Sequence, residues 1–209
     1  MTDLHDKEKG KKIVLDLCGG TGAWSKPYRD NGYDVRVITL PQYDILTYEP
    51  PENVYGILAA PPCTQFSFAK STGNARDLES GMKVVNACMQ IIWKVQYKLK
   101  SKHAKETPLK FWAMENPYGL LRRFMGHPVM VFNPWMWGDM YQKKTCLWGY
   151  FNKPTPKILS YKTTKFDRLH MRDLPVLPKG YSSPVENKRQ SMRAITPQGF
   201  ALAFYKANL

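Results

Sequence analysis

The sequence lacks the close cysteine pairs that metal sites and redox sites use. Its four cysteines are too far apart for any CxxC pair: Cys18, Cys63, Cys88 and Cys146. This spacing argues against a zinc ribbon and a thioredoxin-like site, and we expect no metal. Because thiols stay reduced inside cells, each cysteine is expected to be either a small core residue or a chemical reagent.

Long hydrophobic runs are also missing. No run reaches the 18 apolar residues of a membrane-spanning helix, and the first residues, MTDLHDKEKGKK, are charged rather than apolar. These features predict no membrane span and no secretory signal. We therefore expect a soluble protein with a cytoplasmic location.

Acidic residues are scarce. The 209 residues include 17 Asp and Glu against 31 Lys and Arg, which gives a formal net charge of +14. From Phe151 to Leu209, 11 basic residues stand against 3 acidic ones. A polyanion is the natural partner of such a chain, and nucleic acid is the polyanion we expect.

Alternating strand and helix patterns predict the fold class. We expect strands over 12–17, 35–39, 56–60, 110–116, 129–132 and 144–151, the last two as hairpin arms. Helices are expected over 23–32 and 76–102, and the second has one apolar face: Val84, Cys88, Ile91, Ile92, Val95 and Leu99. This order predicts an α/β protein with a Rossmann-like, doubly wound, mainly parallel sheet.

Composition divides the chain into a tail, a main domain and an insertion. Residues 1–11 form a charged tail, and residues 12–151 with 189–209 form the main domain. Residues 152–188 are basic, rich in proline and without periodicity, which is typical of a loop-rich insertion. Thr196 as N-cap and Pro197 at the first helical position predict a closing helix. The sequence predicts no oligomeric state.

A glycine-rich segment, DLCGGTG, follows the first predicted strand. Gly19, Gly20 and Gly22 permit a tight turn and let backbone amides approach a bound nucleoside or carboxylate. The alternative is an ordinary connection between a strand and a helix. Ligands of such sheets bind at the carboxyl ends of the strands, where this turn lies.

A cysteine follows two prolines after the third predicted strand, in APPCTQFS. Pro61 and Pro62 restrict the backbone, so the Cys63 thiol is held where the chain can barely move. Cysteine is intrinsically nucleophilic even when little of it is ionised. The alternative is a small buried core residue, the common fate of a free cysteine.

A glutamate follows an apolar strand in FWAMENP. Desolvation is expected to raise the pKa of Glu115, which suits proton donation near neutral pH. Its alternatives are a turn cap and an ion pair with a lysine. Cys63 and Glu115 follow strands that are separated by one crossover helix, so we expect them to meet at one edge of the sheet.

Taken together, these motifs resemble those of the DNA cytosine-5 methyltransferases, and they are most similar to the short phage-type members. The resemblance follows the family order along nearly the whole chain: DLCGGTGAW, DILTY, APPCTQFS, MENP, YQKKTCLWG and RAITPQGFALAF. It implies a class I methyltransferase fold. It also implies that residues 152–188 replace a full target-recognition domain, and therefore that the recognised DNA site is short or relaxed.

The resemblance implies a reaction and a set of residues. S-adenosylmethionine would supply a methyl group to cytosine C5 in DNA, and the catalytic residues would be Cys63, Glu115 and Lys144. The cofactor would contact Asp16, Gly19, Gly20, Gly22, Trp24, Asp44 and Pro61. The DNA would contact Gln65, Ser67, Lys70, Asn116 and Lys143. Protection of phage DNA against restriction is a role that the resemblance alone suggests.

The chain departs from the family pattern near the cofactor. Cys18 stands where the family has a phenylalanine that packs on adenine. Leu40 and Pro41 stand where an acidic residue grips the ribose, and Lys144 and Cys146 replace arginines.

Several alternatives remain beside a DNA methyltransferase. They are a non-catalytic protein that binds and masks DNA, the same chemistry on RNA, and a modified methyl donor. An amino methyltransferase is disfavoured because Ala60 and Cys63 stand where those enzymes carry a polar and an aromatic residue.

Overall fold

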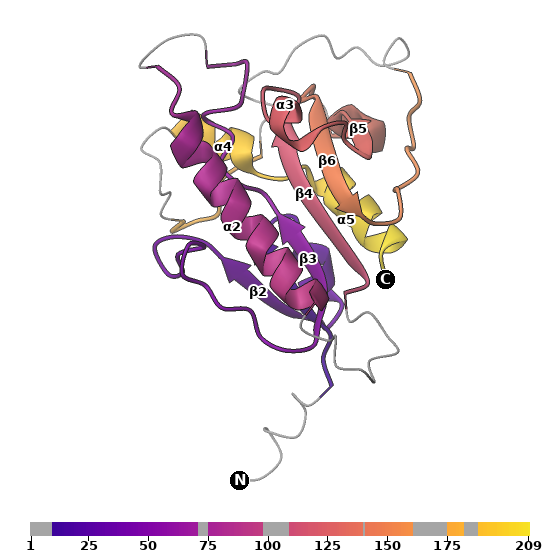
Figure 1. The fold of residues 1–209 in the computed structure, drawn as a ribbon. Coiled ribbons are helices and arrows are strands. Elements are labelled where there is room, and N and C mark those ends of the chain that lie inside the picture. The colour runs from indigo at the N-terminus through magenta and orange to yellow at the C-terminus, as the bar shows by residue number, and fades with distance from the viewer. Residues whose placement is uncertain (1–9, 71–74, 98–108, 140, 161–174, 182–187) are drawn as a thin grey trace.

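The protein is described by a computed structural model that covers residues 10–70, 75–97, 109–139, 141–160, 175–181 and 188–209. It is a mixed α/β fold built on a six-stranded sheet (Figure 1). The strands are β1 (Ile13–Leu17), β2 (Asp34–Ile38), β3 (Val54–Ala59), β4 (Phe111–Pro117), β5 (Met130–Phe132) and β6 (Thr145–Tyr150). The helices are α1 (Lys26–Asp30), α2 (Leu78–Tyr97), α3 (Arg122–Met125), the 3-10 helix η1 (Pro134–Trp137), α4 (Lys188–Ala194) and α5 (Gln198–Ala207).

The sheet is mostly parallel, with the strand order β2-β1-β3-β4-β6-β5. Strands β2, β1, β3 and β4 run parallel, and β6 runs antiparallel to both of its neighbours, β4 and β5. The chain leaves β1 for β2 on one side and then crosses to β3 on the other side. The carboxyl ends of β1 and β3 therefore form the point where the strand order reverses, which is where open α/β sheets bind ligands.

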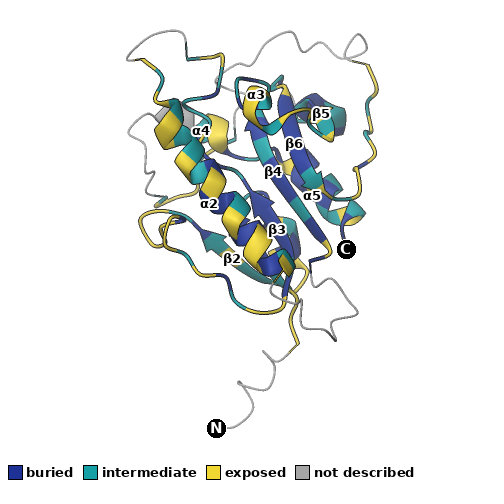
Figure 2. Cartoon of the chain, viewed as in Figure 1, coloured by how far each residue is buried: buried dark blue, intermediate teal, exposed yellow. Residues whose placement is uncertain are grey.

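Helices cover both faces of the sheet, so neighbouring residues of one strand enter two different cores (Figure 1). Leu15, Ile57 and Met114 join the core under α2. Val14 and Leu58 point to the other face and join an aromatic core with α1 and α5. Strands that are apolar on both faces are expected only where a sheet is buried on both sides, and β1 and β3 are each buried at all but one residue (Figure 2).

The long helix α2 begins at a side-chain cap. The Asp77 carboxylate accepts a hydrogen bond from the Ser80 backbone N–H at 2.9 Å, which satisfies one free donor of the first turn. Its buried residues are Val85, Ala87, Cys88, Ile91, Ile92 and Val95. The predicted apolar face is thus confirmed at four of its positions, Val84 is only partly buried, and Leu99 lies outside the described residues.

Most predicted strands and helices are present, and two details differ. The closing helix α5 begins at Gln198 with Pro197 as its N-cap, one residue later than predicted, because proline there has an extended ψ of 133°. The short helices α3, η1 and α4 were not predicted. Within residues 152–160 and 175–181 of the predicted insertion there is neither helix nor strand, and α4 begins at its last residue, Lys188.

In the part of the chain that the structure describes, no helix is long and apolar enough to cross a membrane. The same residues contain no group of three or more His, Cys, Asp or Glu side chains that could hold a metal ion.

Candidate active site

The two motifs singled out in the sequence lie at the point where the strand order reverses. The glycine turn, residues 18–22, follows β1, and the segment 60–70, here called the thiol loop, follows β3. Backbone hydrogen bonds tie both to the sheet: Cys18 N–H donates to the Ile38 carbonyl and Ala60 N–H to the Leu17 carbonyl. The turn and the loop therefore share one edge of the sheet.

A buried carboxylate supports the glycine turn from below. Asp16 is fully buried, and one of its oxygens accepts a hydrogen bond from the Ser25 hydroxyl at 2.5 Å, while the other has no partner. A Cβ on Gly19 would lie 2.4 Å from the Asp16 Cγ, so only glycine fits there. Burial raises the pKa of Asp16 to about 6, although the Ser25 hydrogen bonds oppose this shift.

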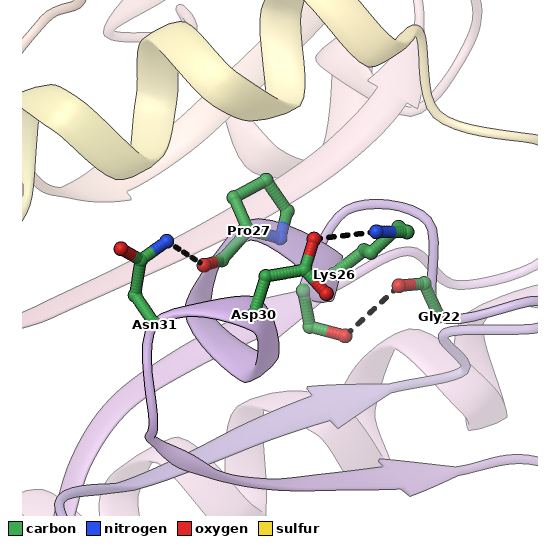
Figure 3. A network of polar contacts seen from close by, with 6 residues as sticks. Gly22, Lys26, Pro27, Asp30 and Asn31 are labelled. Carbon is green, nitrogen blue, oxygen red and sulfur yellow. Dashed lines mark hydrogen bonds and ion pairs between the residues drawn. The ribbon is translucent and has the colours of Figure 1, made fainter.

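A short helix holds the other end of the turn (Figure 3). The Ser25 hydroxyl also donates to the Gly22 carbonyl at 3.2 Å. One turn further on, Lys26 pairs with Asp30, and the Asn31 amide donates to the Pro27 carbonyl at 2.8 Å. These contacts fix the five-residue helix α1 directly after the turn, although α1 is too short to be stable by itself.

Backbone contacts hold the thiol loop in place. The Asn116 amide donates to the Pro61 carbonyl at 2.9 Å, which joins the end of β4 to the loop. The buried Phe66 anchors the loop, and its carbonyl accepts the Leu120 N–H at 2.8 Å. The fit is close, because a Cβ on Gly119 would lie 2.2 Å from that carbonyl oxygen. The position of Cys63 is thus set by β3 and β4 together.

An arginine that the sequence analysis did not select clamps the loop from the other side. The Arg76 guanidinium donates to the carbonyls of Gln65 at 2.8 Å, Ser67 at 2.9 Å and Lys70 at 3.1 Å. Arginine is suited to this task because its planar group offers five donors in a fixed arrangement. In the sequence, the one sign of this role is that Arg76 lies between the thiol loop and α2.

The predicted DNA-contacting side chains of the loop make internal hydrogen bonds. The Gln65 side-chain oxygen accepts from Lys70 Nζ at 3.3 Å and from the Asp77 N–H at 3.0 Å. The Ser67 hydroxyl accepts the Ala69 N–H at 3.2 Å. These contacts order the loop, and a role in binding DNA stays a prediction.

Glu115, near the carboxyl end of β4, forms an ion pair with a lysine. Lys143 Nζ is 3.5 Å from Glu115 Oε1, and the two side chains are only 17% and 14% exposed. Burial raises the pKa of Cys63, and the negative charge of Glu115 raises it further. The positive charges of Lys143 and Arg193 act in the opposite direction. The edge thus brings together a thiol, a carboxylate and two cations, of which Arg193 was not predicted.

The two adjacent lysines before β6 lie in different surroundings. Lys143, predicted to bind DNA, pairs with Glu115, whereas Lys144, predicted to be catalytic, has its Nζ 3.9 Å from the centre of the Tyr118 ring. The register explains this difference, since β6 pairs with β4 and the Lys144 carbonyl accepts the Tyr118 N–H at 2.9 Å. The cation next to the carboxylate is therefore Lys143.

The predicted cofactor residues are in several environments. Trp24 is 1% exposed and packs on Phe200 and Phe204 in the aromatic core, so its geometry gives no support to a direct ligand contact. Asp44 is exposed, and its carboxylate accepts the Leu46 N–H at 2.9 Å. A Cβ on Gly20 would lie 3.4 Å from the hydroxyl of Tyr181, a residue of the insertion that the sequence analysis missed.

The other three cysteines have different surroundings from Cys63. Cys88 and Cys146 are buried in the core, as expected of small apolar side chains. Cys18 is partly exposed at the glycine turn, and its sulfur lies 4.0 Å from the sulfur of Cys88.

Comparisons with known proteins add little to this geometry. No family model and no curated protein sequence matches the chain. Among solved structures, it is similar to the Entamoeba histolytica methyltransferase EhMeth, with 11% sequence identity and a TM-score of 0.37. The similarity covers 71% of this chain and 56% of the other, so the chain spans little more than half the length of that protein.

Proposed function

We propose that this protein transfers a methyl group from S-adenosylmethionine to C5 of cytosine in DNA. The observation that carries the proposal is the grouping of Cys63, Glu115 and Lys143 at the edge where the strand order reverses. A nucleophile beside a carboxylate and a cation matches what covalent addition to a polar ring needs. The family resemblance of the motifs in the sequence points the same way.

In the proposed reaction the ionised Cys63 sulfur forms a bond to C6 of the cytosine. The electron pair of the C5–C6 double bond then moves toward C5, which becomes nucleophilic. Glu115 would bond the N3 side of the ring and the exocyclic amine, with Lys143 holding the carboxylate in position. C5 would take the methyl group as its bond to the donor sulfur breaks, which leaves S-adenosylhomocysteine. C5 would then lose its proton to solvent, the double bond would re-form, and the bond from C6 to the Cys63 sulfur would break to release the thiolate.

Position rather than acidity is the main contribution of the thiol loop. Burial raises the pKa of Cys63, so most of the thiol is protonated at neutral pH. The fixed loop offsets this disadvantage, because correct placement of reacting groups contributes several kcal/mol, about 7 in favourable cases. Lys143 and Arg193 favour the thiolate, and we expect the reaction rate to rise with pH above neutrality.

The glycine turn and its surroundings fit a bound nucleoside in their chemistry. The turn presents backbone without side chains at Gly19 and Gly20, and the exposed Asp44 offers an acceptor after β2. Asp16 and Pro61, which are buried, would hold the turn and the loop rather than touch the ligand. When bound, S-adenosylmethionine supplies the activated methyl group.

A cytosine in duplex DNA hides C6 inside the base stack, so the base must be extruded or the strand must be single. Lys70 and Lys143, together with Gln65 and Ser67, are the proposed contacts to the DNA around the target. Asn116 is fully buried and donates to the Pro61 carbonyl, so it would position the thiol loop instead. The insertion would supply a short recognition surface. The class I methyltransferase fold of the resemblance is part of this proposal.

The proposal is tested by nucleoside mass spectrometry of DNA from cells that express the protein. We expect 5-methylcytosine with the natural chain and a loss on the order of 10³-fold or more for Cys63→Ala. Duplexes with 5-fluorocytosine should form a covalent complex that survives denaturation, except with Cys63→Ala. Cys88→Ala is the matched control, because it removes a thiol from α2 and should keep activity. An active Cys63→Ala protein would exclude the mechanism.

The same preparation separates the alternatives. A masking protein would bind DNA without forming 5-methylcytosine or binding S-adenosylmethionine, as calorimetry would reveal. An RNA enzyme would form 5-methylcytidine instead. A modified donor would leave a different modified base in the same mass spectrum.

A further inference from the structure

Two cations share one aromatic ring next to the candidate site. The Arg122 guanidinium carbon lies 3.5 Å and Lys144 Nζ 3.9 Å from the centre of the Tyr118 ring. Because both distances are measured to the same ring centre, the two positive charges are no farther apart than the sum of these distances. The cluster Arg122–Tyr118–Lys144 therefore concentrates two like charges in a small volume.

No carboxylate neutralises this cluster within the described residues. Neither Arg122 nor Lys144 forms an ion pair there, and the Arg122 Nε is buried without a hydrogen-bond partner. Glu115 precedes Tyr118 by three residues, and its ion pair is with Lys143. The Asp139 carboxylate, which is nearer to Lys144 in the sequence, accepts the Gly199 N–H at 3.0 Å. Lys144 directly follows Lys143, the partner of Glu115, so the cluster lies beside the site.

An aromatic ring reduces the cost of holding two cations but does not remove it. A cation over a ring gains on the order of 1 kcal/mol at a partly exposed position, whereas two like charges a few ångströms apart repel each other. An anion that contacts both would turn this repulsion into attraction. Arginine offers paired donors to phosphate oxygens, and lysine adds a point charge.

The cluster is held rigidly relative to the thiol loop. Tyr118 follows β4 directly and its N–H donates to the Lys144 carbonyl at 2.9 Å. Two residues after Tyr118, Leu120 N–H donates to the Phe66 carbonyl of the thiol loop. The Phe124 ring of α3, which also carries Arg122, lies 6.5 Å from the Phe66 ring. An anion at the cluster would therefore be fixed relative to Cys63.

We propose that Arg122, Tyr118 and Lys144 form a binding site for one phosphate group of the DNA backbone. This inference rests on the proposed function in one respect, namely that the nucleic acid is DNA. Lys144, which the family resemblance assigns to catalysis, then grips the strand that carries the target base. The phosphate would be held at the same edge of the sheet as Glu115 and Cys63. This would limit the directions from which the DNA strand can approach them.

The test measures binding of a labelled DNA duplex as a function of salt concentration. Each phosphate contact contributes about 0.9 to the slope of log affinity against log salt. Because both cations are proposed to hold one phosphate, the double variant Arg122→Gln with Lys144→Gln should lower the slope by about 0.9 and not by twice that amount. Each single variant should weaken binding by about tenfold at physiological salt.

Three controls make the result specific. Lys94→Gln removes an exposed lysine that pairs with Glu49 at 2.6 Å, and it should leave the slope unchanged. Lys144→Arg keeps the charge and should retain the natural slope. Tyr118→Leu keeps both cations but loses the ring, and it should weaken binding less than the double variant. Thermal unfolding of each protein checks that it is folded.

Three results would overturn the proposal. One is a double variant that binds like the Lys94→Gln control, and another is a slope loss near 1.8, which would mean two separate phosphates. Loss of binding to an RNA duplex but not to DNA would also overturn it. The assay needs no methylation, so a failure here leaves the reaction at Cys63 standing, and failed methylation leaves the phosphate site standing.

Discussion

The glycine turn after β1 and the thiol loop after β3 lie at the same edge of the sheet but are held by different means. Side chains support the turn from below, chiefly a buried Asp16 that bonds Ser25. The thiol loop is held by its own backbone carbonyls, which accept from Asn116, Leu120 and Arg76. Cys63 is therefore placed by the rigid sheet, whereas the glycine turn depends on one buried carboxylate.

The largest expected effect concerns the carboxylate under the turn. The pKa of Asp16 is raised from an ordinary value of 3.8 to about 6 in the folded protein. The folded state therefore binds this proton more tightly than the unfolded state, so stability from this group is present below pH 4 and is lost as the pH rises through 6. The loss is up to about 3 kcal/mol.

Denaturant unfolding between pH 4 and pH 7 measures this contribution. Asp16→Asn cannot titrate and should remove that part of the pH dependence, while the exposed Asp44→Asn should keep it. Identical pH profiles for Asp16→Asn and the natural protein would show that the turn does not depend on this carboxylate.

Glycine substitutions compare the packing of the two regions directly. Gly119→Ala would push a Cβ against the Phe66 carbonyl and should lower the free energy of unfolding by about 2 kcal/mol. Gly19→Ala meets the Asp16 side chain, which can shift more easily than a backbone, so its loss should be smaller. As a control, Gly32→Ala meets no atom within 4 Å and carries only the strain of its φ of 86°. A larger loss at Gly19 than at Gly119 would reverse the comparison.

The arginine clamp offers a test that needs no activity assay. Arg76→Gln removes most of the hydrogen bonds to the three loop carbonyls, and the amide of Ser67 should exchange its hydrogen about tenfold faster. The amide of Gly22, which bonds the Gly19 carbonyl within the turn, should be unaffected. Arg36→Gln, which breaks an exposed ion pair with Asp34, is the control. Equal changes in both regions would mean that they open together.

The smallest expected effect concerns the reactivity of the thiol. Lys143→Gln removes a charge that favours the thiolate and should slow alkylation of Cys63 by iodoacetamide a few-fold near pH 8. Glu115→Gln removes a charge that opposes the thiolate and should speed it. Lys144→Gln is the matched control, because Lys144 is directed to Tyr118 instead. Peptide mass spectrometry measures the alkylation rate of Cys63 separately from the other thiols. Equal rates in all three variants would show that Lys143 and Glu115 do not act on Cys63.

The strands could be predicted from the sequence because each is an apolar run between turn-forming residues. Runs such as GILAA, with Ile57 and Leu58 facing opposite cores, are typical of a sheet buried on both faces. The helices α3 and η1 could not be predicted, since four residues are too few to show a helical period. Pattern therefore predicted the layers but not the short connections.

The motifs that form the site could be predicted from the sequence, but the contacts between their side chains could not. Adjacent residues of an extended chain point in opposite directions, so the sequence could not decide whether Lys143 or Lys144 meets Glu115. An aromatic residue after a glycine turn fits a ligand pocket and a core equally well, and Trp24 turned out to pack in the core. Arg76 and Arg193 carry no local pattern that separates them from other surface cations.

The reversed direction of β6 has a practical consequence for protein engineering. A parallel strand would deliver its preceding connection to the far edge, but β6 starts where β4 ends, with Thr145 opposite Pro117. Lys143 and Lys144, which precede β6, thus reach the edge of the sheet that carries Glu115. A peptide grafted before β6 would be displayed at the same edge as Glu115, so new contacts can be installed there without cutting the sheet.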